Sequence, residues 1–159
     1  MKTHRAFQMH AHITWHTWRR VACIDTIAAE EIRLVAARAG KQTGVEVLRG
    51  AVLADHVHFV VSFRPDTRIS DFVRIVKSST GMLANRRVFG ALKWCRGFYV
   101  TTYHKNDLAR VQRYVDRQFQ HHPDRVPRDP RSSSRPGFLT PGVSPGLTNT
   151  GDRHGLGAR

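Results

Sequence analysis

The strongest constraint on the fold is the alternation along residues 56–63, His-Val-His-Phe-Val-Val-Ser-Phe. Successive side chains of a β-strand point to opposite faces, so every second residue of this segment shares a face. One face is purely apolar and belongs in a hydrophobic core: Val57, Phe59, Val61 and Phe63. The pattern therefore predicts a strand that directs His56 and His58 away from that core, side by side on the other face of the sheet.

Comparable patterns predict three further strands. Segments rich in Thr, Ile, Val, Tyr and Trp favour strands over His10–Trp18, Val45–Leu53 and Trp94–Tyr103. Asp55 is expected to form the turn into the strand that begins at His56.

Helical periodicity predicts three helices between and after these strands. The first is expected to be capped by Asp25 or Thr26 and to stop at Gly40. The second is expected from about Ile69 to Phe89. Asn106 is expected to cap the last helix, which has an apolar stripe at helical spacing: Leu108, Val111, Val115 and Phe119.

The resulting order is β-α-β-β-α-β followed by an additional C-terminal helix. This order is typical of the ferredoxin-like split pattern. We therefore expect an α+β fold with one antiparallel sheet and helices on one face.

Residues 1–122 are expected to form this single domain. Residues 123–159 hold six of the 7 prolines and half of the 12 glycines, which predicts a flexible Pro/Gly/Arg-rich tail.

The chain is strongly basic. It carries 26 Lys and Arg against 12 Asp and Glu, a formal net charge of +14. Such a balance favours a polyanionic partner, although basic ribosomal and membrane-surface proteins share it. No stretch reaches the roughly 18 apolar residues of a membrane span, and the N-terminal segment lacks the apolar core of a signal peptide. We therefore expect a cytoplasmic protein that does not enter a membrane.

The histidine pair alone does not define a metal site, because most His-X-His pairs are structural or lie on the surface. Two imidazoles need a third ligand, and Gln118 offers a carbonyl oxygen that suits Mg²⁺ or Mn²⁺ better than Zn²⁺. Asp55 either orients one imidazole or simply forms the turn before it.

Tyr114 precedes Gln118 by four residues, so a helix would place both on one face. A tyrosine at the edge of an apolar stripe is usually a core-rim residue with its hydroxyl in water. The alternative is a nucleophile that attacks phosphorus beside a metal.

These motifs together resemble a known family. Val52-Leu-Ala-Asp-His56-Val-His58-Phe-Val-Val61 and, further on, Tyr114-Val-Asp-Arg-Gln118 are similar to motifs of the HUH single-tyrosine transposases of small insertion sequences and of the REP-associated tyrosine transposases. The resemblance spans about His10–His122. It implies a metal held by His56, His58 and Gln118, with Tyr114 as the nucleophile. It also implies a homodimer that acts on single-stranded DNA with hairpins through a 5′-phosphotyrosine.

Eight basic residues are expected to contact the DNA: Arg19, Arg20, Arg74, Lys77, Arg86, Arg87, Lys93 and Arg96. Trp18 and Trp94 are candidates for stacking on unpaired bases. Two alternatives remain at this point. One is a non-catalytic nucleic-acid-binding module on a ferredoxin-like sheet. The other is an HUH enzyme that nicks DNA for replication or conjugation.

Overall fold

Strand β3 (His56–Phe63) lies inside a four-stranded antiparallel sheet with the order β2-β3-β1-β4. It pairs on one side with β2 (Val45–Val52) and on the other with β1 (Met9–His16). Strand β4 (Tyr99–Tyr103) pairs with β1 and forms an edge of the sheet. The computed structural model describes residues 8–132, and within them it confirms the α+β fold and the predicted β-α-β-β-α-β order.

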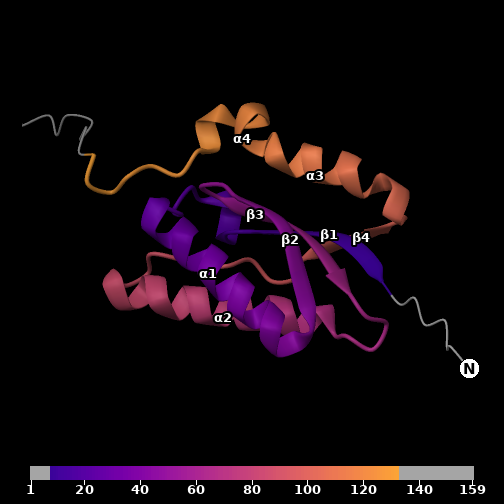
Figure 1. Cartoon of the computed structure of the whole chain (residues 1–159). Helices are drawn as coiled ribbons and strands as arrows, with labels where there is room; N and C mark the ends of the chain where they lie inside the picture. Colours follow the sequence, from indigo (N-terminus) through magenta and orange to yellow (C-terminus); the bar gives the residue numbers. More distant parts are fainter. Residues whose placement is uncertain (1–7, 133–159) are drawn as a thin grey trace, which may run out of the picture.

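The helices lie in two layers around this sheet (Figure 1). Helices α1 (Thr26–Thr43) and α2 (Ile69–Arg87) cover one face. Helices α3 (Leu108–Asp116) and α4 (Gln118–His121) lie over the other face. The additional C-terminal helix is therefore split in two, and it covers the face of the sheet that carries the histidines.

Each layer has its own apolar core. The larger core joins α1 and α2 to the face of β3 that carries Val57, Phe59, Val61 and Phe63, as the alternation predicts. The smaller core lies under α3 and contains Ala51, Leu53, Val60 and Val115. All eight residues of β3 are consequently buried, including both histidines.

Helix α1 begins as predicted but does not end where the sequence analysis expected. Asp25 caps it, since its carboxylate accepts from the backbone N–H of Ala28 at 2.7 Å. The helix continues through Gly40 to Thr43, and Gly44, which has a φ of 74°, caps its C-terminal end. Gly40 does not stop the helix. A Cβ at this position would collide with the carbonyl oxygen of Val45, so Gly40 is required for a close approach to β2.

The fourth strand is shorter than the predicted segment Trp94–Tyr103. It begins only at Tyr99, and Trp94 forms a single bridge with Thr17. Gly97 has a φ of 75°, which interrupts extended backbone. The side chain of Lys77 also donates to the carbonyls of Cys95 and Gly97, at 2.7 Å each, so these carbonyls face a helix.

The ends of strand β1 and helix α2 also differ from the predicted ends. Strand β1 stops at His16, and the residues Trp18–Arg20 form a 3₁₀ turn. Helix α2 ends at Arg87, two residues before the predicted end.

The last helix departs from its prediction in two ways. Asn106 does not cap it: Asn106 lies in a 3₁₀ turn (Lys105–Asp107), where its backbone N–H bonds to Nδ1 of His104 at 3.2 Å. The helix also breaks at Arg117, whose φ and ψ are −90° and 2°. Tyr114 therefore lies on α3, and Gln118 begins α4.

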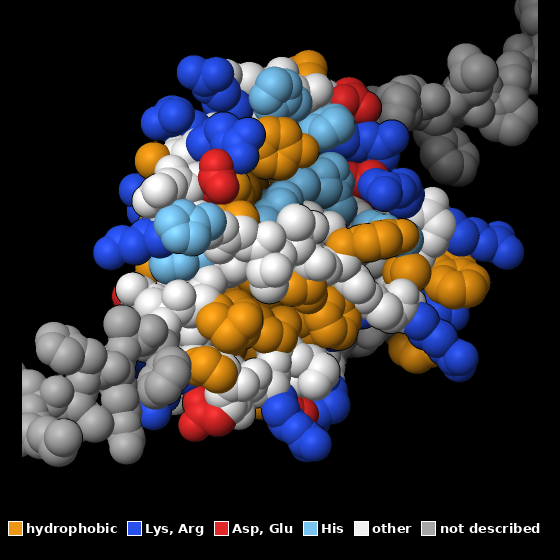
Figure 2. All heavy atoms as spheres, turned by 90° about the vertical axis from the view of Figure 1, so that its right-hand side faces the viewer, with side chains coloured by type: hydrophobic (Ala, Val, Ile, Leu, Met, Phe, Trp, Pro, Cys, Tyr) orange, Lys and Arg blue, Asp and Glu red, His pale blue; other side chains and the backbone are white. Residues whose placement is uncertain are grey.

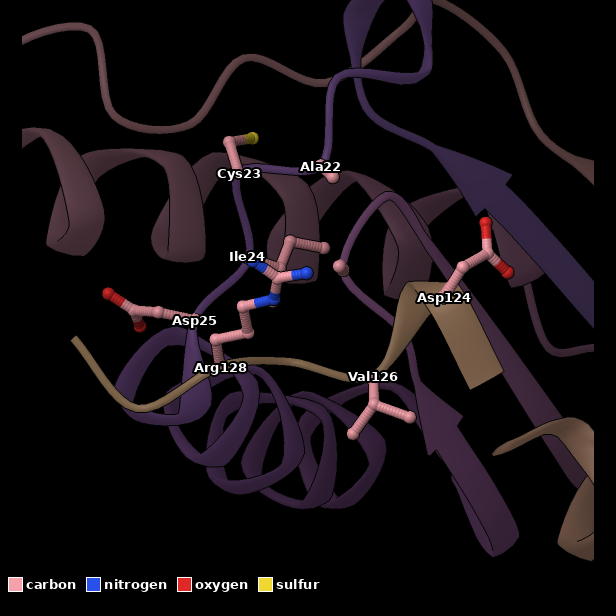
Figure 3. Close-up of a pocket in the computed structure, with 8 residues that line it drawn as sticks. Ala22, Cys23, Ile24, Asp25, Asp124, Val126 and Arg128 are labelled. Carbon is pink, nitrogen blue, oxygen red and sulfur yellow. The ribbon is translucent and has the colours of Figure 1, made fainter. Parts of the chain in front are cut away.

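The segment that follows α4 returns to the domain. The backbone N–H of Ala54 donates to the carbonyl of Arg125 at 2.7 Å, and that of Thr26 donates to Arg128 at 3.2 Å. Figure 3 shows this segment passing beside Ala22–Asp25, around a cavity of ≈ 310 Å³. The predicted tail comprises residues 123–159. Its residues 123–128 pack on the fold, and its residues 133–159 lie outside the described residues. Between residues 8 and 132, no helix combines the length and the apolar character that a membrane crossing requires.

Candidate active site

The histidine-bearing face of the sheet forms the floor of a cavity under α3 and α4. The strand register places His16 opposite His56 and Thr14 opposite His58, and Tyr99 of β4 lies opposite Thr14. The cavity has a volume of ≈ 280 Å³, and its lining includes Thr14, His16, Arg20, His56, His58, Tyr99, Tyr114, Gln118 and His122. All four predicted catalytic and metal-binding residues therefore meet in one place.

His56 is held by the carboxylate that precedes it. Nδ1 of His56 lies 2.6 Å from Oδ1 of Asp55, whose side chain is only 4% exposed. The second carboxylate oxygen lies 3.3 Å from the guanidinium of Arg125. Burial lowers the pKa of His56, and the hydrogen bond to Asp55 opposes that shift. With Nδ1 donating to Asp55, a neutral His56 presents the lone pair of Nε2.

His58 is held by a second histidine. Its Nδ1 lies 2.9 Å from Nε2 of His12. Burial, followed by the neighbouring imidazoles of His12, His56 and His122, lowers the pKa of His58 to about 3. His58 is therefore neutral at physiological pH. Its buried Nε2 has no hydrogen-bond partner.

Gln118 supplies the third candidate ligand. It is 1% exposed, and its amide nitrogen donates to the carbonyl of Tyr114 at 3.1 Å. That bond fixes the amide orientation and leaves Oε1 buried without a partner. Buried acceptors without a donor are costly, and a cation is one way to satisfy them.

The donor set thus fits a divalent cation. Two neutral imidazoles and an amide oxygen line the same cavity. Imidazole nitrogen is a common ligand of divalent metals, and the amide oxygen is the ligand that favours Mg²⁺ or Mn²⁺. Across the part of the chain that the structure describes, no cluster of three or more His, Cys, Asp or Glu residues has the arrangement of a metal site. The candidate site depends on Gln118 for its third ligand.

Tyr114 is the accessible member of the group. It is 48% exposed, and its ring centroid lies 5.9 Å from that of His12 and 6.2 Å from that of His58. A nucleophile must reach a substrate from solvent, and this position beside the imidazoles allows it.

Several site residues were absent from the sequence-based prediction: His12, Thr14, His16 and His122. A signal for three of them existed, because positions 10, 12, 14 and 16 alternate polar side chains with Ala11, Ile13 and Trp15. The fourth, His122, depends on how the chain turns after α4. Figure 2 shows histidine side chains gathered in a recess, with Lys and Arg side chains around it.

Four of the predicted DNA-contacting residues lie near this cavity. Arg20 lines it, and both Arg19 and Arg20 have positive φ values, 55° and 54°. Such φ values are uncommon outside glycine and often mark functional sites. Lys93 lies 4.8 Å and Arg19 5.9 Å from the centroid of the half-exposed Trp18 ring. Arg96 lines a neighbouring cavity of ≈ 290 Å³.

The other four predicted contacts belong to α2, on the opposite layer. Arg74 pairs with Asp71 at 3.7 Å, and Arg87 pairs with Glu31 at 3.1 Å. Arg86 is exposed near the end of the helix, and Lys77 bonds to backbone carbonyls. The structure does not bring these residues to the cavity. A DNA contact by any of them stays a prediction.

Comparison with known proteins agrees with this geometry. A family model described as "Transposase IS200 like" matches residues 5–118. The ISDra2 transposase TnpA of Deinococcus radiodurans is 24% identical over 119 residues, which cover 70% of this chain and 85% of that protein. The transposase for insertion sequence element IS200 of Salmonella typhimurium is 32% identical over 84 residues, which cover 48% of this chain and 54% of that one.

Two solved structures share the fold. A proposed transposase from Deinococcus radiodurans R1 superposes with a TM-score of 0.56 at 23% identity, over 74% of this chain and 98% of that one. A REP-associated tyrosine transposase bound to a REP hairpin gives a TM-score of 0.60 at 16% identity, over 77% and 74% of the two chains. Because the family model spans well over half of the sequence, the chain belongs to the IS200-like transposase family, whose members are enzymes of DNA transposition.

Proposed function

We propose that this transposase cuts and rejoins single-stranded DNA through a covalent bond to Tyr114. The hydroxyl oxygen of Tyr114 attacks the phosphorus of the scissile phosphate, and the bond from phosphorus to the 3′ oxygen breaks. The leaving oxygen takes up a proton and becomes a free 3′-OH, while the 5′ phosphate stays on the tyrosine. Attack by the 3′-OH of another strand then reverses these steps and joins the DNA.

His56, His58 and Gln118 are proposed to hold a divalent cation, Mg²⁺ or Mn²⁺. When bound, this cation would polarise the scissile phosphate and stabilise the leaving oxygen. One observation carries the proposal: His58 Nε2 and Gln118 Oε1 are both buried polar atoms without a hydrogen-bond partner, in the cavity that the accessible Tyr114 also lines.

The proposed substrate is single-stranded DNA with a hairpin near the cut. A relative of the same fold has been solved with a REP hairpin, which supports this choice. The Trp18 ring beside Arg19 and Lys93 offers a surface for an unpaired base next to backbone phosphates. Homodimer formation and a cytoplasmic location stay predictions from the sequence and its family resemblance.

The decisive experiment uses end-labelled single-stranded DNA and Mg²⁺. Wild-type protein should give an adduct that resists denaturant, and Tyr114→Phe should give none while it still binds the DNA. Tyr99→Phe is the matched control, because Tyr99 also lines the cavity and is exposed. Formation of the adduct by Tyr114→Phe would show that another residue is the nucleophile.

A further inference from the structure

The C-terminal segment reaches the metal site through one ion pair. Arg125 follows Gln118 by seven residues, and its guanidinium lies 3.3 Å from Oδ2 of Asp55. The other oxygen of that carboxylate receives the Nδ1–H of His56 at 2.6 Å. Residue 125 lies beyond residues 5–118, which match the family model.

The carboxylate of Asp55 needs both of these partners. Its side chain is 4% exposed, so water cannot readily replace a lost contact. A neutral imidazole supplies one hydrogen bond but no positive charge. A buried carboxylate that loses a cationic partner is strongly disfavoured, and it relieves this cost by moving towards water.

The backbone on both sides of the pair is fixed. The carbonyl of Asp55 accepts from the N–H of Thr17 at 2.8 Å and from its hydroxyl at 3.2 Å. The carbonyl of Arg125 accepts from the N–H of Ala54 at 2.7 Å. The backbones of Arg125 and Asp55 are therefore held in register. The Arg125 side chain is 37% exposed, and its Nε also donates to Oδ2 of Asp124 at 3.0 Å.

We propose that Arg125 is a positioning residue for the metal site, acting through Asp55 on His56. This inference rests on the proposed role of His56 as a metal ligand. Arg125 holds the carboxylate in the orientation that accepts from Nδ1, and this leaves the lone pair of His56 Nε2 free to bind a cation. The segment 123–128 is therefore part of the catalytic domain and not of a dispensable tail.

The test measures Mn²⁺ affinity by electron paramagnetic resonance, which needs no DNA cleavage. Arg125→Gln should weaken Mn²⁺ binding by roughly tenfold, the lower end of the loss seen when partners of metal ligands are removed. Arg125→Lys, which keeps the charge, should restore part of that loss. Arg128→Gln removes an exposed charge from the same segment and should bind Mn²⁺ as the wild type does.

A double-mutant cycle separates positioning from general destabilisation. In an Asp55→Asn background the ion pair no longer exists, so adding Arg125→Gln should leave Mn²⁺ affinity unchanged. The ring nitrogens of His56, observed by nuclear magnetic resonance, should show a mixed tautomer in Arg125→Gln. Equal affinities for Arg125→Gln and Arg128→Gln, or additive effects in the cycle, would overturn the inference. Unchanged Mn²⁺ affinity in His56→Ala would instead overturn the proposed metal site itself.

Discussion

Nε2 of His12 lies 2.9 Å from Nδ1 of His58, so a single hydrogen joins the two rings. His58 is the more buried ring, and its other nitrogen has no partner. If His58 donates from Nδ1, its Nε2 is left as a free acceptor in the cavity. His12 on β1 thus contacts Nδ1 of His58 as Asp55 contacts Nδ1 of His56. Both candidate ligands are therefore oriented by a neighbouring side chain.

Replacement of His12 should therefore loosen the metal site. We expect His12→Ala to weaken Mn²⁺ binding about tenfold, because His58 loses the acceptor that fixes its tautomer. His12→Gln, whose amide oxygen can accept the same hydrogen, should lose less. Calorimetric titration of Mn²⁺ measures the difference, and equal losses in both variants would contradict the hydrogen-bond explanation.

The depressed pKa of His58 predicts that the metal-free protein is sensitive to acid. The pKa falls from 6.5 in the unfolded chain to about 3 in the folded one. Between these values the unfolded chain binds a proton that the folded chain does not. Protonation of His58 therefore leaves the free energy of unfolding unchanged well above pH 6.5 and lowers it as the pH falls below that value. At pH 5 the loss from this one group is roughly 2 kcal/mol.

Denaturant unfolding in EDTA at pH 7.5 and at pH 5 measures this loss. The free energy of unfolding of wild-type protein should decrease between the two conditions, and that of His58→Gln should decrease by less. Equal pH dependence in the two proteins would show that His58 is not the group responsible.

Arg20 and Arg74 make a matched pair for testing where the DNA passes. Arg20 lines the candidate active-site cavity, whereas Arg74 lies on α2 in the opposite layer and pairs with Asp71. We expect Arg20→Ala to slow cleavage of single-stranded DNA by 10-fold or more at saturating substrate, since it removes a cation beside the scissile phosphate. Arg74→Ala should leave that rate within about twofold. Equal rates for both variants would remove Arg20 from the cleavage site.

The strands of the sheet and the residues of the candidate site could be predicted from the sequence. The contacts that orient the candidate metal ligands could not. The alternation in β3 places His56 and His58 on one face whatever the partner strands are, and α3 needs only its apolar stripe to lie over them. The contacts of His12 and Arg125 depend on strand register and on the path of the chain after α4. Neither follows from local periodicity.

Lys77 is a residue whose predicted role differs from the contacts that it makes in the structure. Its charge suggested a DNA contact, but two of its three hydrogens bond to the carbonyls of Cys95 and Gly97. We expect Lys77→Met to destabilise the fold by about 2 kcal/mol, because hydrogen bonds to charged donors are strong and both carbonyls lose their partner. Thermal unfolding measures the effect. Lys93→Met, which changes an exposed lysine beside Trp18, should leave the unfolding temperature nearly unchanged.

The last prediction concerns the form of the DNA. The candidate ligands are buried at the floor of a cavity of ≈ 280 Å³. In the proposed mechanism the DNA backbone would therefore have to bend inward to bring the scissile phosphate to both His58 and Tyr114. A single strand can make that bend, whereas a strand held in a duplex resists it. We expect cleavage of a single strand with a hairpin beside the cut to exceed cleavage of the same sequence as perfect duplex by at least 100-fold. Binding should also weaken steeply between 50 and 200 mM salt, because phosphate contacts release counterions. Comparable cutting of the two substrates, measured side by side with labelled DNA, would point to an ordinary duplex nuclease.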